Sequence, residues 1–161
     1  FWKINLNRND LKNLGSSLGS DIPIFIEGEA KKAKGRGEIF SETQLKQEVI
    51  LLIMPNCNIS TKKAFEEIKQ SDFKESINKE DFNFFEKWAR ENFKEVNDSF
   101  NWIEIFKKGN LSGTGSAIYA KFNSFEEASK IMDNAPENGK YLITRSINKS
   151  PLIKELNDIG V

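Results

Sequence analysis

The sequence predicts an α+β fold in which helices cover one face of a mostly antiparallel sheet. From residue 46 onward, strand-like and amphipathic helical segments follow one another in the order strand, helices, strand, helix, strand. The 161 residues are 38% hydrophobic and 30% charged, which is typical of a globular chain that can build one good core or two small ones.

The first 45 residues predict one helix followed by extended segments. Asn9 can cap a short helix that Gly19 ends. The leucines of this helix fall at helical spacing: Leu11, Leu14 and Leu18. Residues 21–26 predict a strand, and a second extended segment runs through Ala33. Residues 41–47 are polar and predict a crossing between two structural units.

The middle of the chain predicts a buried strand and then helices. Residues 49–54 are apolar on both faces, which predicts a central buried strand stopped by Pro55. Ser60 caps the next helix, and its inward side chains are expected to be Ala64, Phe65 and Ile68. Apolar residues at spacings of three and four then predict a strongly amphipathic helical region: Phe82, Phe85, Ala89, Phe93, Val96, Phe100 and Ile103. A cap at residues 97–99 predicts a break within it.

The last third predicts two strands around a helix. Residues 116–122 read as a strand, and a short strand is expected near Asn110. A capping box over Ser124–Glu127 opens the next helix, whose inward side chains are Ala128, Ile131 and Met132. Residues 141–147 supply the last strand, and Pro151 begins a tail.

The composition excludes several kinds of function. Twenty-four basic and 24 acidic residues give a net charge of zero, whereas nucleic-acid binders usually carry a basic surplus. Histidine is absent, which removes Ser-His-Asp and Cys-His catalysis and leaves proton transfer to carboxylate, lysine or tyrosine. Cys57 is the only cysteine, so it forms no internal disulfide, and we interpret it as inert. The longest apolar run is too short to span a bilayer, and a cytoplasmic location is expected.

Two short segments are candidates for chemistry. Ser112-Gly-Thr-Gly-Ser116 precedes a strand, and its glycines would let backbone N–H groups approach a phosphate. It is neither a Walker loop nor a dinucleotide fingerprint, and a simple glycine-rich turn is the alternative. Asp21 is either a turn residue between Gly19 and Pro23 or an acid that accepts a proton from a substrate hydroxyl.

Four segments in this order resemble the cytidyl-methylerythritol kinases, a group of the GHMP-type small-molecule kinases. The first is Leu18-Gly-Ser-Asp-Ile-Pro-Ile-Phe-Ile-Glu-Gly28, with Gly35-Arg-Gly-Glu38 after it. The second is Pro55-Asn-Cys-Asn-Ile-Ser-Thr61 with Ala64-Phe65, the third Leu111-Ser-Gly-Thr-Gly-Ser-Ala117, and the fourth Ile147-Asn-Lys-Ser-Pro-Leu152. The likeness covers nearly the whole chain.

The resemblance implies a GHMP kinase fold with a ferredoxin-like C-terminal layer, and transfer of a phosphoryl group from ATP, with Mg²⁺, to the 2-hydroxyl of 4-diphosphocytidyl-2-C-methyl-D-erythritol. Asp21 matches the catalytic aspartate of that group. Thr61 and Phe65 match positions that contact the cytidine end of the substrate, Phe65 by stacking on the base. The matching phosphate-loop residues are Ser112, Gly113, Thr114 and Gly115. No nucleic-acid or membrane partner is implied.

The chain also departs from the family pattern. Phe84 stands where the family usually carries an aspartate, in Asn83-Phe-Phe-Glu86. The nucleotide loop of the family and a lysine that partners the aspartate belong before residue 1. We therefore expect residues 1–45 to be a remnant of the N-terminal kinase domain and residues 46–161 to be the C-terminal domain. We also expect the chain by itself to be inactive.

Two alternatives remain open from the sequence. One is another GHMP-type kinase, of the homoserine or mevalonate type, against which Gly35-Arg-Gly-Glu38 and Phe65 argue. The other is a non-catalytic ferredoxin-like binding module for RNA or a small effector. The zero net charge argues against RNA.

Overall fold

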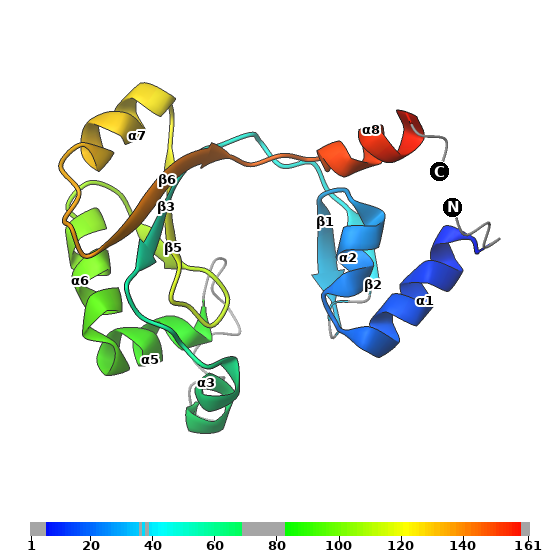
Figure 1. The fold of residues 1–161 in the computed structure, drawn as a ribbon, viewed down its shortest axis with the longest axis horizontal. Helices are drawn as coiled ribbons and strands as arrows, with labels where there is room; N and C mark the ends of the chain where they lie inside the picture. The colour runs from blue at the N-terminus through cyan, green and yellow to red at the C-terminus, as the bar shows by residue number, and fades with distance from the viewer. Residues whose placement is uncertain (1–5, 36, 38, 69–82, 159–161) are drawn as a thin grey trace. The chain divides into compact units, whose positions relative to one another are not determined.

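The computed structural model describes residues 6–35, 37, 39–68 and 83–158. The chain divides into two compact units (Figure 1). Unit 1 comprises Phe1–Gln47 with Ile147–Val161, and unit 2 comprises Glu48–Ser146. The tail after residue 146 thus contacts the first unit. The predicted assignment of residues 1–45 and 46–161 to two kinase domains stays a prediction.

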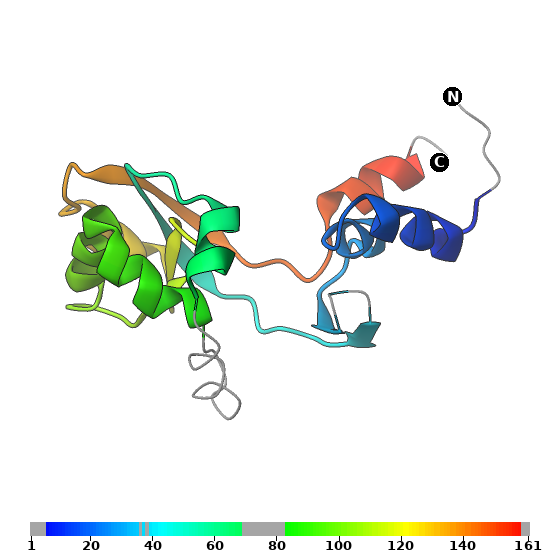
Figure 2. The same cartoon turned by 90° about the horizontal axis from the view of Figure 1, so that it is seen from below.

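Unit 2 is an antiparallel sheet covered by helices on one face. Its strands are β3 (Val49–Pro55), β4 (Gly109–Leu111), β5 (Ile118–Phe122) and β6 (Gly139–Arg145), in the order β4-β5-β3-β6. All three pairings are antiparallel. The helices α5 (Phe84–Asn92), α6 (Lys94–Ile103) and α7 (Phe125–Met132) lie along the sheet in both ribbon views (Figures 1 and 2). The predicted α+β class is therefore confirmed.

The core of unit 2 lies between the sheet and these helices. β3 is central, as predicted, but its burial alternates: Val49, Leu51 and Ile53 are buried and the residues between them are half-buried. The prediction of a strand buried on both faces is wrong, because helices cover the antiparallel sheet on one side. The remaining large core side chains come mainly from α6 and β5: Val96, Phe100, Ile103, Ile118 and Phe122.

The helices of unit 2 begin where polar side chains cap them. Ser60 accepts from the backbone N–H of Lys63 at the start of α3 (Thr61–Glu67), and Ser124 accepts from that of Glu127 at the start of α7, so both predicted caps are confirmed. On α3, Ala64 is buried as expected. Phe65 is 62% exposed, so its predicted inward orientation is wrong.

The break in the amphipathic region lies at Phe93, not at residues 97–99 as predicted. Phe93 is extended, with φ −129° and ψ 105°, and separates α5 from α6. Within α6, the hydroxyl of Ser99 donates to the carbonyl of Glu95 instead of capping a helix. Residues 97–99 are thus helical. Phe82, the first residue of the predicted stripe, lies outside the described residues.

Unit 1 begins with two short helices. The first, α1 (Arg8–Leu18), ends at Gly19 as predicted, but Asn7 rather than Asn9 caps it, because Asn7 Oδ1 accepts from two backbone N–H groups of the first turn. Residues 22–27 form α2 (Ile22–Glu27), so the strand predicted at 21–26 is wrong. Pro23 fits the first helical turn, and Gly28 ends the helix at φ 64°.

A hairpin and a last helix complete unit 1. The strands β1 (Lys31–Lys34) and β2 (Ile39–Glu42) pair antiparallel, so only residues 43–47 of the predicted polar crossing lack helix or strand. Residues 151–158 form α8 (Pro151–Asp158) where a tail was predicted. At Gly28, an added Cβ would lie 2.6 Å from Cδ1 of Ile153 on α8, so glycine also permits close packing there. No helix within the described ranges is long and apolar enough to cross a bilayer.

Candidate functional site

The glycine loop (Ser112–Ser116) connects β4 to β5 in unit 2. The N–H of Ser112 donates to the carbonyl of Ala117 at 2.8 Å, and the N–H of Gly115 donates to that of Ser112 at 2.9 Å. Gly113 and Gly115 have φ values of 56° and 90°, where side chains with a Cβ are strained. At Gly115 a Cβ would also lie 2.9 Å from Ile59 Cδ1. The loop conformation therefore depends on glycine.

The loop lies against the segment that precedes α3. The hydroxyl of Ser116 donates to the carbonyl of Cys57 at 2.9 Å, and the hydroxyls of Thr61 and Thr114 are 3.3 Å apart. Two segments more than 50 residues apart in sequence are thus joined side by side. Burial raises the pKa of the Cys57 thiol, which favours its protonated, unreactive form.

An aromatic pocket opens beside the glycine loop. It has a volume of about 400 Å³, and among its lining residues are Phe65, Phe84, Phe85, Gly113, Thr114 and Tyr119. The ring of Phe65 meets that of Phe85 edge-to-face, with centroids 4.9 Å apart and planes at 75°. Phe65 nevertheless remains 62% exposed, so most of its surface is accessible beside the glycine loop. Thr61 and Phe65 lie on one side of α3, four residues apart.

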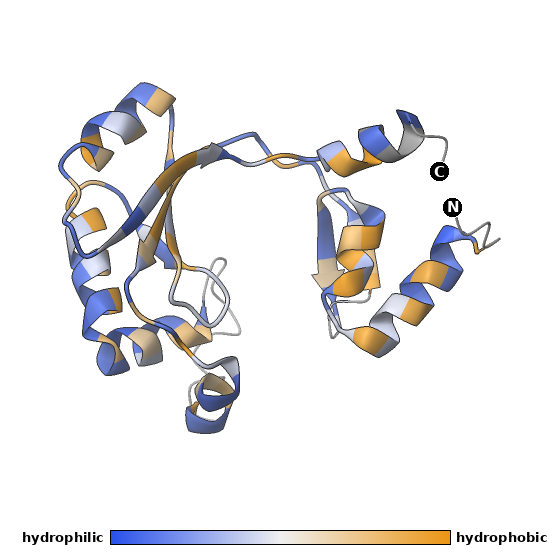
Figure 3. Ribbon diagram, viewed as in Figure 1, coloured by the Kyte–Doolittle hydropathy of each residue, from blue (hydrophilic) through white to orange (hydrophobic). Residues whose placement is uncertain are grey.

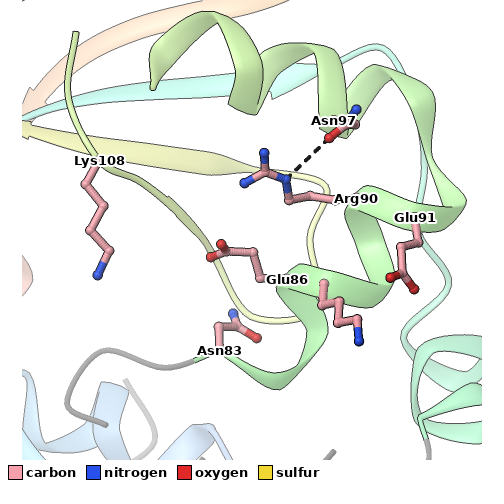
Figure 4. A pocket seen from close by; sticks show the side chains of 7 residues that line it. Asn83, Glu86, Arg90, Glu91, Asn97 and Lys108 are labelled. Carbon is pink, nitrogen blue, oxygen red and sulfur yellow. Dashed lines mark hydrogen bonds between the residues drawn. The ribbon is translucent and has the colours of Figure 1, made fainter. Parts of the chain in front are cut away.

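A second pocket, of about 620 Å³, is also lined by Asn83 and Glu86 (Figure 4). Burial raises the pKa of Glu86 in this pocket, although the backbone N–H of Leu111 and nearby Arg90 act in the opposite direction. The guanidinium of Arg90 is already bound: it reaches both carboxylate oxygens of Glu104 at 3.0 Å and Oδ1 of Asn97 at 3.3 Å. Two of the residues that line this pocket, Arg90 and Asn97, thus bind each other, and Arg90 also pairs with Glu104.

Asp21 lies in unit 1, immediately before α2. Its side chain is exposed and makes no capping hydrogen bond to that helix. Nor does it form a hydrogen bond or ion pair with any residue in the described part of the chain. The structure thus brings Thr61, Phe65 and the glycine loop together in unit 2, whereas Asp21 belongs to unit 1. Arg36 and Glu38 of the Gly35–Glu38 motif are outside the described residues.

Three contributors to this region appeared in the sequence analysis but were not predicted as site residues: Asn83, Phe85 and Glu86. Asn83 Nδ2 donates to the carbonyls of Leu111 and Gly113, and its Oδ1 accepts from the N–H of Phe85. An asparagine ahead of an amphipathic helix is a capping signal, and that signal could have placed Asn83 at the start of α5. Its bonds to a loop about 30 residues away had no local signal.

The chain is homologous to small-molecule kinases over nearly its whole length. These relatives are named 4-diphosphocytidyl-2-C-methyl-D-erythritol kinase, so the resemblance drawn from the motifs is confirmed. The protein of that name from Buchnera aphidicola subsp. Schizaphis graminum is 34% identical over 161 aligned residues, covering 94% of this chain and 54% of that protein. The one from Haemophilus ducreyi is 35% identical over 163 aligned residues, covering 98% and 58%. The chain thus spans little more than half the length of these relatives.

The fold is shared with a solved kinase. A crystal structure of 4-(cytidine 5'-diphospho)-2C-methyl-D-erythritol kinase matches with a TM-score of 0.73 and 18% identity, over 89% of this chain and 58% of that one. At this identity the match concerns the fold, and it confirms the predicted combination of helices with an antiparallel sheet. No family model matches the chain.

Proposed function

We propose that this chain takes part in transferring the γ-phosphoryl group of ATP to the 2-hydroxyl of 4-diphosphocytidyl-2-C-methyl-D-erythritol. This is a step in the non-mevalonate formation of isoprenoid precursors. The names of its relatives support the reaction. The observation that carries the proposal is that the glycine loop and the exposed ring of Phe65 border one pocket. A phosphate-binding backbone beside an aromatic face suits a substrate that contains both a diphosphate and a pyrimidine.

Each candidate residue has a role in this proposal. The carboxylate of Asp21 accepts or orients the proton of the attacking hydroxyl. The N–H groups of the glycine loop stabilise charge on phosphoryl oxygens. Phe65 stacks on the cytosine ring, which contributes about 1–3 kcal/mol for one base. The Thr61 hydroxyl lies 3.3 Å from that of Thr114, which lines the same pocket, and offers a further polar contact beside it.

ATP and Mg²⁺ are the cofactors of the proposed reaction. The fit of this chain to a phosphate rests on the glycine loop, because Gly113 is exposed and a Cβ built on it would meet no atom within 4 Å, so a ligand could approach the backbone there. Within the described ranges, no three His, Cys, Asp or Glu side chains gather as a metal-binding group. We therefore assign no magnesium ligand to this chain. Magnesium bound to ATP would shield the triphosphate charge.

Replacing Asp21 tests the proposed base. In the protein as its gene encodes it, Asp21→Asn should lower kcat by about a hundredfold or more, because the amide keeps the shape of the carboxylate but accepts no proton. The KM for the cytidyl substrate should change little. Steady-state assays with this substrate, and with homoserine and mevalonate as competing acceptors, measure both constants. Asp10→Asn, an acid-to-amide change in the same unit, is the matched control. Near-normal turnover of Asp21→Asn would leave Asp21 as a turn residue.

Replacing Phe65 tests the stacking surface. Phe65→Ala should raise the KM for the cytidyl substrate by about tenfold, which corresponds to the loss of one stacked base. The KM for ATP should stay within about twofold. Phe125→Ala removes another partly exposed phenylalanine of unit 2 and should change neither constant. Equal increases in both KM values for Phe65→Ala would instead indicate a role in packing.

A further inference from the structure

We infer that Asn83 is a positioning residue for the glycine loop, and that its side-chain amide turns the N–H of Thr114 toward a bound phosphate, next to the N–H of Gly113, which the hydrogen bond from Gly115 to Ser112 orients. The inference rests on the proposed function, and it adds a residue to the same site. Asn83 does not contact the phosphate itself. It acts through the loop backbone, which it ties to the first turn of α5.

The hydrogen bonds of Asn83 use both ends of its amide. Nδ2 donates to the carbonyl of Gly113 at 2.8 Å and to that of Leu111 at 2.9 Å. Oδ1 accepts from the backbone N–H of Phe85 at 2.9 Å, which caps α5. The helix is in turn fixed in the core by Trp88 and Ala89, both of which are buried. The side chain therefore connects the loop to a rigid element.

Because a peptide group is planar, a hydrogen bond to its carbonyl also fixes the direction in which its N–H points. In a trans peptide, the C=O and the N–H of the next residue point in opposite directions. Because the carbonyl of Gly113 is held by Asn83, the N–H of Thr114 points away from Asn83. Similarly, the carbonyl of Ser112 accepts from Gly115, which turns the N–H of Gly113 the opposite way. Neither N–H donates to any acceptor among residues 6–35, 37, 39–68 and 83–158.

Packing does not hold Gly113 in place. A Cβ built on Gly113 would meet no atom within 4 Å, whereas one on Gly115 would touch Ile59 and Leu111. Glycine at φ 56° also has many other conformations available to it. The hydrogen bond from Asn83 thus restrains the Gly113–Thr114 peptide, together with the bond from Gly115 to Ser112 and the contact between the Thr114 and Thr61 hydroxyls. Without the bond from Asn83, the loop would spend less time with both N–H groups presented to one anion.

Asn83→Ser separates the positioning role from the helix cap. Serine is as good an N-cap as asparagine, so the start of α5 is preserved. Its short hydroxyl carries a single donor and cannot replace the two bonds that Nδ2 makes to loop carbonyls. The substitution also leaves the charge unchanged, so its effect on anion binding does not come from electrostatic repulsion. Ser124→Ala, which removes the cap of α7, is the control for a purely structural loss.

The test is a titration of the protein, as its gene encodes it, with inorganic pyrophosphate, followed by amide NMR. In the unsubstituted protein the Gly113 and Thr114 N–H resonances should shift on binding. Asn83→Ser should weaken binding by about tenfold, the loss expected for one or two hydrogen bonds to a charged group. Ser124→Ala should leave the affinity unchanged. Equal affinity of Asn83→Ser and the unsubstituted protein would overturn the inference, and so would unshifted Gly113 and Thr114 resonances.

A second variant covers the case in which Asn83→Ser does not fold. Asn83→Asp keeps the size and the cap but has no donor for the loop, so the carbonyl carbon resonance of Gly113 should shift without any ligand. An unchanged resonance would overturn the inference. The outcome is separable from the proposed function. A protein that binds pyrophosphate through Thr114 but does not phosphorylate the cytidyl substrate would refute the proposed reaction and leave the role of Asn83 intact.

Discussion

The two units of this chain differ in how they bury apolar side chains. In unit 2, Leu51, Ile53 and Phe100 are completely buried. In unit 1, Leu18 and Phe25 are 74% and 77% exposed, and its only buried residues among those described are Gly15 and Pro23. The apolar residues of α1 and α2 are visible as orange segments among polar ones (Figure 3). Unit 2 therefore has a core of its own, whereas unit 1 lacks a comparable one among its described residues.

Unit 1 depends instead on close helix packing and on ion pairs. A Cβ on Gly15 would lie within 3 Å of the side chains of Ile22 and Ile26, so α1 and α2 approach each other closely at this glycine. Lys12 Nζ binds Glu27 Oε1 at 2.6 Å across the same two helices. Contacts of this kind contribute less than core burial. The residues with proposed roles are divided between the units: the glycine loop and Phe65 belong to the well-packed unit 2, and Asp21 belongs to unit 1.

The largest expected effect is a difference between two phenylalanines. Phe100→Ala in unit 2 should lower the free energy of unfolding by about 3–5 kcal/mol, because it leaves a cavity under Gly109 and Ile103. Phe25→Ala in unit 1 should change it by about 0.5 kcal/mol or less, because the ring is already in water. Urea unfolding followed by circular dichroism measures both values. A loss for Phe25→Ala as large as that for Phe100→Ala would contradict the exposure of its ring.

Most of the unit 2 fold could be predicted because local signals and tertiary packing agree there. The apolar run of β3 predicted a central strand, and the Ser124–Glu127 capping box predicted the start of α7. In unit 1, the local signals conflict with one another. The isoleucines of α2 favour a strand, whereas Pro23 and Gly28 are helix start and stop signals, and packing on α1 favours the helix.

Only the part of the candidate site that lies in a short sequence motif, the glycine loop, could be predicted from local sequence. The glycines of the loop could be read locally, since their positive φ angles are a backbone requirement. The exposure of Phe65 could not, because helical spacing alone does not say which residues the rest of the fold leaves uncovered. The bonds between Asn83 and the loop join residues about 30 positions apart, and no pattern within either segment indicates them.

The smallest expected effect is an opposite pH dependence of the two units. In unit 1, the hydrogen bond from Lys12 lowers the pKa of Glu27 below its usual 4.5, so its stabilisation is present above pH 4.5 and lost as the pH falls through the lowered pKa. In unit 2, burial raises the pKa of Glu86, so its contribution is complete below pH 4.5 and is lost as the pH rises through the raised pKa. Acid should therefore weaken unit 1 and relieve a cost in unit 2.

Native-state hydrogen exchange between about pH 7 and about pH 3 measures this difference, because it reports the opening free energy of each unit separately. Glu27→Gln should remove the acid-induced loss seen at the α2 amides, and Glu86→Gln should remove the acid-induced gain seen at those of α5. The exposed Glu91, on the same helix as Glu86, supplies the control Glu91→Gln, which should preserve the pH dependence of both units. If the Glu27 and Glu86 substitutions changed that dependence in the same direction, burial of Glu86 and pairing of Glu27 would not be the dominant causes. The two units would then respond to acid alike, despite the difference in their cores.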